Sequence, residues 1–168
     1  YELGQGVPED KGHAVELYRQ AAKRGLSRAQ CNLGYCYYEG IGIQKDDDQA
    51  FYWFSEAAEQ GNSRGQCMLG LCYETGRGVA EDKLKATEYY RQAADNGNVT
   101  AMCNLGYCYY TGIGVAEEEP EAGRWVRQAA ERGQPRALFL LGECYEEGHG
   151  VAADLDKARG YYQKAADK

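Results

Sequence analysis

Histidine, proline and phenylalanine are scarce in this sequence. Of its 168 residues only two are histidine, three are proline and three are phenylalanine. Two histidines argue against histidine-based catalysis, and no Gly-x-Ser-x-Gly, Ser-x-x-Lys or His-Glu-x-x-His motif occurs. No apolar run approaches ~18 residues, and the mean hydropathy is -0.69, so we expect neither a transmembrane helix nor a membrane partner.

Positive charge is also in short supply. The chain has 19 lysines and arginines against 26 aspartates and glutamates, which gives a formal net charge of -7. A chain this acidic repels phosphate backbones, so we expect no general nucleic-acid binding. Hydrophobic residues make up 43% of the sequence, which is enough for a packed core and excludes a disordered chain.

Glycine, tyrosine and cysteine are plentiful, with 22, 15 and 7 residues, and they recur at a fixed interval. The segment Cys31–Tyr38 reads CNLGYCYY and returns at Cys103–Tyr110, 72 residues later. A weaker copy at Cys67–Tyr73 lies halfway between them, and a fourth lies at Phe139–Tyr145, so the period is 36 residues. Paired glycines keep the same period: Gly4 and Gly6, Gly40 and Gly42, Gly76 and Gly78, Gly112 and Gly114, and Gly148 and Gly150.

Each period is predicted to form two helices. The first covers about Arg28–Glu39 and the second about Asp47–Gln60, because apolar residues recur in both at the spacing of one helix face. The expected buried positions are Ala29, Leu33, Cys36 and Tyr37 in the first helix, and Ala50, Trp53, Phe54, Ala57 and Ala58 in the second.

Local residues mark the helix ends. The pair Gly40 and Gly42 stops the first helix, since glycine permits the positive φ of a tight reversal. Asp46 is expected to cap the second helix through its carboxylate, and Gly61 to end it. By position, Asp82 and Asp154 are expected to cap in the same way.

One hairpin of this kind cannot bury both of its faces, whereas stacked hairpins can. The predicted fold is therefore all-α, a right-handed α/α solenoid of 36-residue helix-turn-helix repeats. We expect a single array over residues 1–168. It comprises a partial first repeat at 1–28, full repeats at 29–64, 65–100 and 101–136, and a last repeat at 137–168. Since Tyr1 aligns with Tyr37 in the middle of a helix, we expect the chain to be part of a longer array.

The repeat pattern strongly resembles the Sel-1-like repeat family, a relative of the tetratricopeptide repeats. The residues that carry the resemblance are Ala29, Leu33-Gly34, Tyr37, Gly40-x-Gly42-Ile43, Asp46, Ala50, Phe54, Ala57-Ala58 and Gly61. It covers the whole chain, and the period of 36 residues and the double glycine favour this family over tetratricopeptide repeats of about 34 residues. The copies depart little, with Gly65 in place of an alanine and Glu118 in place of the capping aspartate.

The cysteines are predicted to be free. Cys31 and Cys36 lie five residues apart on one helix, so their Cα atoms are about 8.7 Å apart, beyond the disulfide limit of about 7 Å. Cysteines at equivalent positions of successive repeats are about 10 Å apart. We therefore expect small buried core residues at Cys36, Cys72, Cys108 and Cys144. The cysteine-rich secreted members of the family carry a disulfide across each hairpin, whereas this chain has both cysteines of a repeat on the same helix. The comparison with those members therefore implies a reduced, cytoplasmic protein here. No signal-peptide pattern opens the chain.

We expect no cofactor and no metal. Evenly spaced thiols cannot converge on a zinc ion, and Asp46–Asp48 lacks the spaced ligands and turn glycine of a calcium loop. The Gly-x-Gly turns lack a third glycine and follow helices, which argues against nucleotide binding. His149 occupies a turn position that holds isoleucine or arginine in the other copies, so we interpret it as a turn residue.

The resemblance implies a non-catalytic scaffold or adaptor that binds a protein or peptide in a concave groove lined by the first helix of each repeat. Tyr35, Tyr38, Tyr107 and Tyr110 have no core to fill on that face, and tyrosine is a favoured binding residue. The alternatives are that these tyrosines pack only against neighbouring repeats, and that Asn32 and Asn104 make structural bonds. The predicted partner-binding residues are Arg28, Asn32, Tyr35, Tyr38, Arg64, Leu71, Glu74, Asn104, Tyr107, Tyr110, Arg136, Phe139, Glu143 and Glu146.

These residues predict a groove that is aromatic at its centre and acidic towards its C-terminal end. The expected partner segment has apolar anchors and at least one basic residue. The competing hypothesis is a hydrolase of the β-lactam-hydrolysing type ascribed to cysteine-rich secreted relatives. It requires a nucleophile with a base, and the sequence motifs supply none.

The spacing of the cysteines predicts the outcome of a thiol titration. Under native conditions a thiol reagent reacts slowly, because the thiols are buried, and after unfolding without reductant all 7 cysteines react. Fewer than seven reactive thiols in the unfolded chain would reveal a disulfide.

Overall fold

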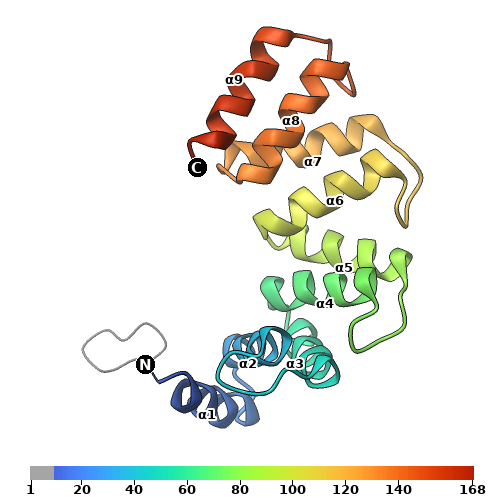
Figure 1. Ribbon diagram of the computed structural model, residues 1–168. Helices are drawn as coiled ribbons and strands as arrows, with labels where there is room; N and C mark the ends of the chain where they lie inside the picture. Colours follow the sequence, from blue (N-terminus) through green and yellow to red (C-terminus); the bar gives the residue numbers. More distant parts are fainter. Residues whose placement is uncertain (1–9) are drawn as a thin grey trace. The chain divides into compact units, whose positions relative to one another are not determined.

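The computed structural model describes residues 10–168, and every regular element in that range is an α-helix (Figure 1). The chain divides into two compact units, residues 1–82 and 83–168. The helices of the first unit are α1 (Lys11–Lys23), α2 (Ser27–Glu39), α3 (Asp47–Glu59) and α4 (Ser63–Thr75). Those of the second unit are α5 (Lys83–Asp95), α6 (Val99–Thr111), α7 (Glu119–Glu131), α8 (Pro135–Glu147) and α9 (Leu155–Ala166).

In both units each helix packs on the next one along the chain, and in the first unit α2 also contacts α4. The predicted all-α fold of consecutive helix pairs is confirmed. The expectations that involve Tyr1, Gly4 and Gly6 lie outside the described residues.

The helix boundaries agree closely with those read from the sequence. Helix α2 begins one residue earlier than predicted, and α3 ends one residue earlier, at Glu59. The backbone of Gly40 is left-handed, with φ 75°, and its N–H donates to the carbonyl of Cys36 at the end of α2. The positive φ confirms that this glycine ends the helix.

The predicted caps differ from repeat to repeat. Asp46 accepts a hydrogen bond from the Gln49 N–H at 2.9 Å, and Asp154 accepts one from Lys157 at 3.0 Å, so both caps are confirmed. Glu118 occupies the equivalent position before α7 but makes no such bond with its side chain. Gln134, whose side chain is equally long, does cap α8 by accepting from the Ala137 N–H at 2.7 Å, so side-chain length alone does not explain the missing bond. The Asp82 cap stays a prediction.

Close approach between paired helices depends on a glycine in the first helix of each pair. A Cβ atom on Gly34 of α2 would lie 2.7 Å from a ring carbon of Phe54 in α3, well inside van der Waals contact. The phenylalanine ring therefore lies directly against the backbone of α2, and it is fully buried. Burial of such a side chain contributes about 1.5–3 kcal/mol to stability.

The second glycine of each turn has a separate function. A Cβ on Gly42 would collide with the main-chain carbonyl of Lys11, at the start of α1 in the preceding repeat. The same relation holds in the second unit, where Gly150 faces the carbonyl of Glu119 at 2.7 Å from the hypothetical Cβ. The absence of a side chain at these positions allows successive repeats to stack.

The buried residues lie at the positions expected from the sequence, with one exception. Ala50, Phe54, Ala57 and Ala58 are buried, and Trp53 is half-buried. All seven cysteines are free and buried, as the helix geometry predicted. The exception concerns a tyrosine pair in α2, in which Tyr37 is half-buried while Tyr38, expected on the open face, is only 9% exposed.

The cap geometry generates a stability prediction for α9. Replacement of Asp154 by alanine removes the hydrogen bond to the Lys157 N–H and lowers the free energy of unfolding by about 1 kcal/mol. Urea denaturation followed by circular dichroism measures the change.

Glu118→Asp is the matched variant, because it shortens the side chain at the position where the cap is missing. It is expected to raise the stability. An unchanged stability in Asp154→Ala would show that the cap bond contributes nothing.

Candidate functional site

In the first unit, an arginine of α4 lies against two predicted binding residues of α2. The Arg64 Nη1 donates to Oδ1 of Asn32 at 3.2 Å, and the guanidinium carbon lies 5.2 Å from the centre of the Tyr35 ring. Arg64 is exposed, and the other two side chains are half-buried. An arginine held by an amide oxygen and an aromatic face loses less rotamer freedom when it binds a ligand.

The second unit repeats this arrangement 72 residues further on. The Arg136 Nη1 donates to Oδ1 of Asn104 at 3.1 Å, and the guanidinium lies 5.2 Å from the Tyr107 ring centre. We call the two sets the Asn–Tyr–Arg clusters: Asn32, Tyr35 and Arg64 in the first unit, and Asn104, Tyr107 and Arg136 in the second. The prediction left open whether the asparagines make structural bonds, and the structure shows that both do.

Beside the first cluster lies an open cleft of about 340 Å³. Two arginines, Arg28 and Arg64, line it, and no carboxylate is among its lining residues. The other lining residues are Cys31, Asn32, Asn62 and Ser63. The cleft is therefore positive in a chain whose net charge is negative.

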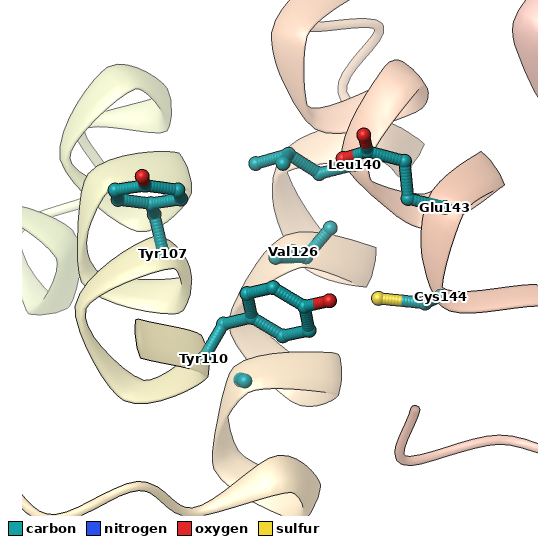
Figure 2. Close-up of a pocket in the computed structure, with 7 residues that line it drawn as sticks. Tyr107, Tyr110, Val126, Leu140, Glu143 and Cys144 are labelled. Atoms are coloured by element: carbon teal, nitrogen blue, oxygen red, sulfur yellow. The ribbon is translucent and has the colours of Figure 1, made fainter. Parts of the chain in front are cut away.

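The second unit has an apolar pocket where α6 faces α8 (Figure 2). Tyr107 and Tyr110 of α6 lie on one side of it, Leu140 of α8 on the other, and Val126 of α7 between them. The space measures about 10 Å³, enough for one water molecule. Ala122, Glu143 and Cys144 complete the lining.

Carboxylates of α8 border this pocket. Burial raises the pKa of Glu143, and the negative charges of Glu147 and Glu146 raise it further. A carboxylate that is partly buried among like charges is stabilised by a cation. The electrostatics of this edge therefore favour a basic group on any molecule that binds there.

Two tyrosine hydroxyls reach these glutamates. The Tyr110 hydroxyl donates to Glu147 at 3.0 Å and lies 2.9 Å from Nδ1 of His149, whose ring packs on the tyrosine edge to face. The Tyr162 hydroxyl of α9 donates to Glu146 at 2.5 Å. These bonds hold the acidic side chains in place on the surface of α8.

Tyr38 corrects the sequence interpretation. It was expected to have no core to fill, but its ring packs on Phe54 and is covered by the guanidinium of Arg77, 3.4 Å from the ring centre. The same arginine donates to Asp47 at 2.6 Å and to the Tyr38 carbonyl at 2.7 Å. Because these contacts enclose it, Tyr38 has little surface left for a partner.

The remaining predicted residues are spread over the two units. Leu71 and Glu74 of α4 are half-buried, and neither lines the positive cleft. In the second unit Phe139 is 48% exposed and its ring packs on Tyr162, while Glu146 is exposed. The structure thus brings together Tyr107, Tyr110 and Glu143 at one pocket, and Arg28, Asn32 and Arg64 at another.

Sequence reasoning missed the contacts of Arg77 and His149. Both occupy the central position of a Gly-x-Gly turn, and each reaches the tyrosine 39 residues before it, Tyr38 or Tyr110. The shared offset was visible in the repeat alignment. The prediction treated this position as a plain turn residue, and the ring contact of His149 shows that it also packs.

Within residues 10–168, no three histidine, cysteine, aspartate or glutamate side chains gather as metal ligands would. None of the helices in the described part of the chain is both long and apolar enough to cross a membrane.

Comparison with known families gives a match over the whole chain. The family model of the Sel1 repeat matches residues 1–26, 27–62, 63–98, 99–134 and 135–168. Comparison of the sequence with curated proteins finds no match.

Several solved structures resemble the chain. One is c5321, a protective antigen of uropathogenic Escherichia coli strains with an SLR fold, at 39% identity and a TM-score of 0.88. Another is a Sel1 repeat protein from Oxalobacter formigenes, at 32% identity and a TM-score of 0.92. Both alignments cover 99% of this chain, but it spans 36% of the first protein and 66% of the second. The immunity protein Pa5087 from Pseudomonas aeruginosa is similar at 27% identity and a TM-score of 0.68, over 94% of this chain and 58% of that one.

The environment of Tyr110 generates a titration prediction. Burial, the hydrogen bond to Glu147 and nearby negative charges raise the pKa of Tyr110 from 10.0 to about 12. The stability that this protonated hydroxyl contributes is present below pH 10 and is lost as the pH rises towards 12. Carbon NMR of a chain labelled at tyrosine Cζ measures the midpoint.

Glu147→Gln is the matched variant, since it removes the negative charge but retains a polar acceptor. The midpoint of Tyr110 moves back towards 10.0 in this variant, but not fully, because burial remains. A midpoint near 10.0 in the unaltered chain would contradict the geometry.

Proposed function

Because this chain belongs to the Sel1 repeat family, whose members are generally protein-interaction scaffolds, we propose that it is a scaffold that binds a segment of a partner protein. The binding surface is the side of the second unit where α6 faces α8. The observation that carries the proposal is the apolar pocket of Figure 2 with the carboxylates beside it. Residues that can bind an apolar side chain lie there next to carboxylates that can bind a basic one.

The apolar part of the surface consists of Tyr107, Tyr110 and Leu140. All three are half-buried, so each presents part of its side chain to solvent while the rest is supported by the core. Tyrosine offers a large contact area with few rotatable bonds, which makes it effective at binding surfaces. An apolar side chain of the partner anchors at the mouth of this pocket.

The acidic part of the surface selects the charge of the partner. Glu143 borders the pocket, and the exposed Glu146 and Glu147 follow along α8. A lysine or arginine next to the apolar anchor relieves the repulsion among these carboxylates. Acidic segments are excluded at this edge, which is an effect on specificity more than on affinity.

We propose no catalytic step for this surface. The side chains at the pocket bind and orient a partner through apolar contact and charge, and the groups among them that carry a heteroatom are the two tyrosines, Glu143 and the buried Cys144. The affinity for a single flexible segment is expected to be in the micromolar range, because ordering the segment opposes binding.

Selection of random peptides displayed on phage tests the proposal. We expect enrichment of peptides with an apolar residue close to a lysine or arginine. The double variant Tyr107→Ala with Tyr110→Ala weakens binding of such a peptide by about 1–3 kcal/mol in a fluorescence anisotropy titration, while the helical circular dichroism signal is retained.

Two further variants make the result interpretable. Tyr52→Ala removes a 48% exposed tyrosine from α3 and leaves the affinity unchanged. Tyr107→Leu introduces the residue that the chain itself has at the equivalent Leu71, so it weakens binding without disturbing the fold. Peptide binding that is unchanged in both the double alanine variant and Tyr107→Leu would place the binding surface elsewhere.

A further inference from the structure

We infer that the two Asn–Tyr–Arg clusters are carboxylate-binding sites, which take an acidic side chain or a terminal carboxylate of a partner protein. Each cluster holds one arginine in a fixed orientation without neutralising its charge. Neither Arg64 nor Arg136 has a carboxylate partner among residues 10–168, where each bonds an uncharged asparagine instead.

The geometry leaves one edge of each guanidinium for a ligand. Nη1 is the atom that donates to the asparagine, so the edge formed by Nε and Nη2 has no acceptor within the described part of the chain. These two N–H groups are parallel and match the two oxygens of a carboxylate, which gives the bidentate pairing that arginine makes best. The tyrosine ring supports the other side of the cation.

The cleft beside the first cluster supports the same conclusion independently. Arg28 and Arg64 both line its 340 Å³, and no acidic residue does. Arg64 also influences the thiol of Cys31, another lining residue: burial raises the pKa of this thiol, and the arginine acts against that effect. An anion is the ligand that this lining favours.

Packing does not require the clusters. At the positions equivalent to Asn32 and Tyr35, the intervening repeat has Met68 and Leu71, and helix α4 is nevertheless 13 residues long, as α2 and α6 are. The cluster therefore occurs twice within residues 10–168 and is not a requirement of the repeat packing.

The clusters add a second charge preference to the binding surface. Arg136 lies one turn before Leu140 on α8, and Glu143 and Glu147 follow it. A partner segment therefore meets a positive charge, an apolar pocket and a negative edge in that order. We expect it to carry an acidic residue, an apolar residue and a basic residue in the matching order.

Small-molecule titrations of the full chain test the inference. The probes are N-acetylglutamate amide, which has a side-chain carboxylate, N-acetylglutamine, which has only the α-carboxylate, and the uncharged N-acetylglutamine amide. NMR signals of the arginine Nε–H groups report binding. The carboxylate probes shift the signals of Arg64 and Arg136 to saturation, and the uncharged probe does not. Tighter binding of N-acetylglutamate amide would identify the ligand as an acidic side chain, and tighter binding of N-acetylglutamine would identify it as a terminal carboxylate.

The variants are chosen from the chain itself. Arg64→Gln abolishes saturable binding in the first unit. Asn32→Met with Tyr35→Leu keeps the arginine but removes its support, and weakens binding roughly threefold or more. Arg24 is the matched control, since it is exposed and its side chain has neither an asparagine nor a tyrosine ring against it.

Three results would overturn the inference. These are equal shifts for Arg24 and Arg64, unchanged affinity in the Asn32→Met, Tyr35→Leu variant, and tighter binding of inorganic phosphate than of either carboxylate. The inference rests on the proposed function only for the statement that the carboxylate belongs to a protein. Saturable probe binding without any selected peptide would reject the proposed function alone, and peptide selection without probe binding would reject the carboxylate sites alone.

Discussion

The packing of each hairpin depends on a glycine that lets a side chain of the second helix lie on the backbone of the first. In the first unit this contact joins Gly34 and Phe54. In the second unit Gly106 faces Val126, and Gly142 faces Tyr162, at 2.6 Å from the hypothetical Cβ in both cases. Different side chains fill the same space, so the constraint is the missing Cβ and not the identity of the partner. A side chain at any of these glycines would separate the two helices.

This constraint divides the first helix of each pair into two faces. The glycine faces the second helix, and the half-buried positions are released from the core. In α6 those positions carry Asn104, Tyr107 and Tyr110, and in α2 they carry Asn32 and Tyr35. The proposed binding residues thus lie where packing makes the weakest demand on residue type. The contrast with Met68 and Leu71 in α4 shows how freely these positions vary within one chain.

Local features were predictable from the sequence because short-range rules govern them. The ends of α2 and α3, the caps at Asp46 and Asp154, and the free cysteines all follow from spacing along one helix or turn. The missing side-chain bond at Glu118 does not follow from such a rule, because Gln134, whose side chain is equally long, does cap α8.

The tyrosine pairs were harder to predict, because residues far along the chain decide which ring is covered. Tyr38 is enclosed by Arg77 of the next turn, whereas Tyr110 meets His149 with 5.1 Å between the ring centres and stays half-buried. The helix pattern alone treats the two tyrosines alike. The Asn–Tyr–Arg clusters escaped notice for a similar reason, since their members were predicted singly and the bond between Asn104 and Arg136 spans 32 residues.

The central claim is that the side of the second unit where α6 faces α8 binds a partner segment. Hydrogen–deuterium exchange of the full chain, with and without a selected peptide, tests it most directly. We expect slower exchange in α6 and α8, concentrated around Tyr107, Tyr110 and Leu140, with little change in α5. Protection confined to α5, α7 or α9 would contradict it.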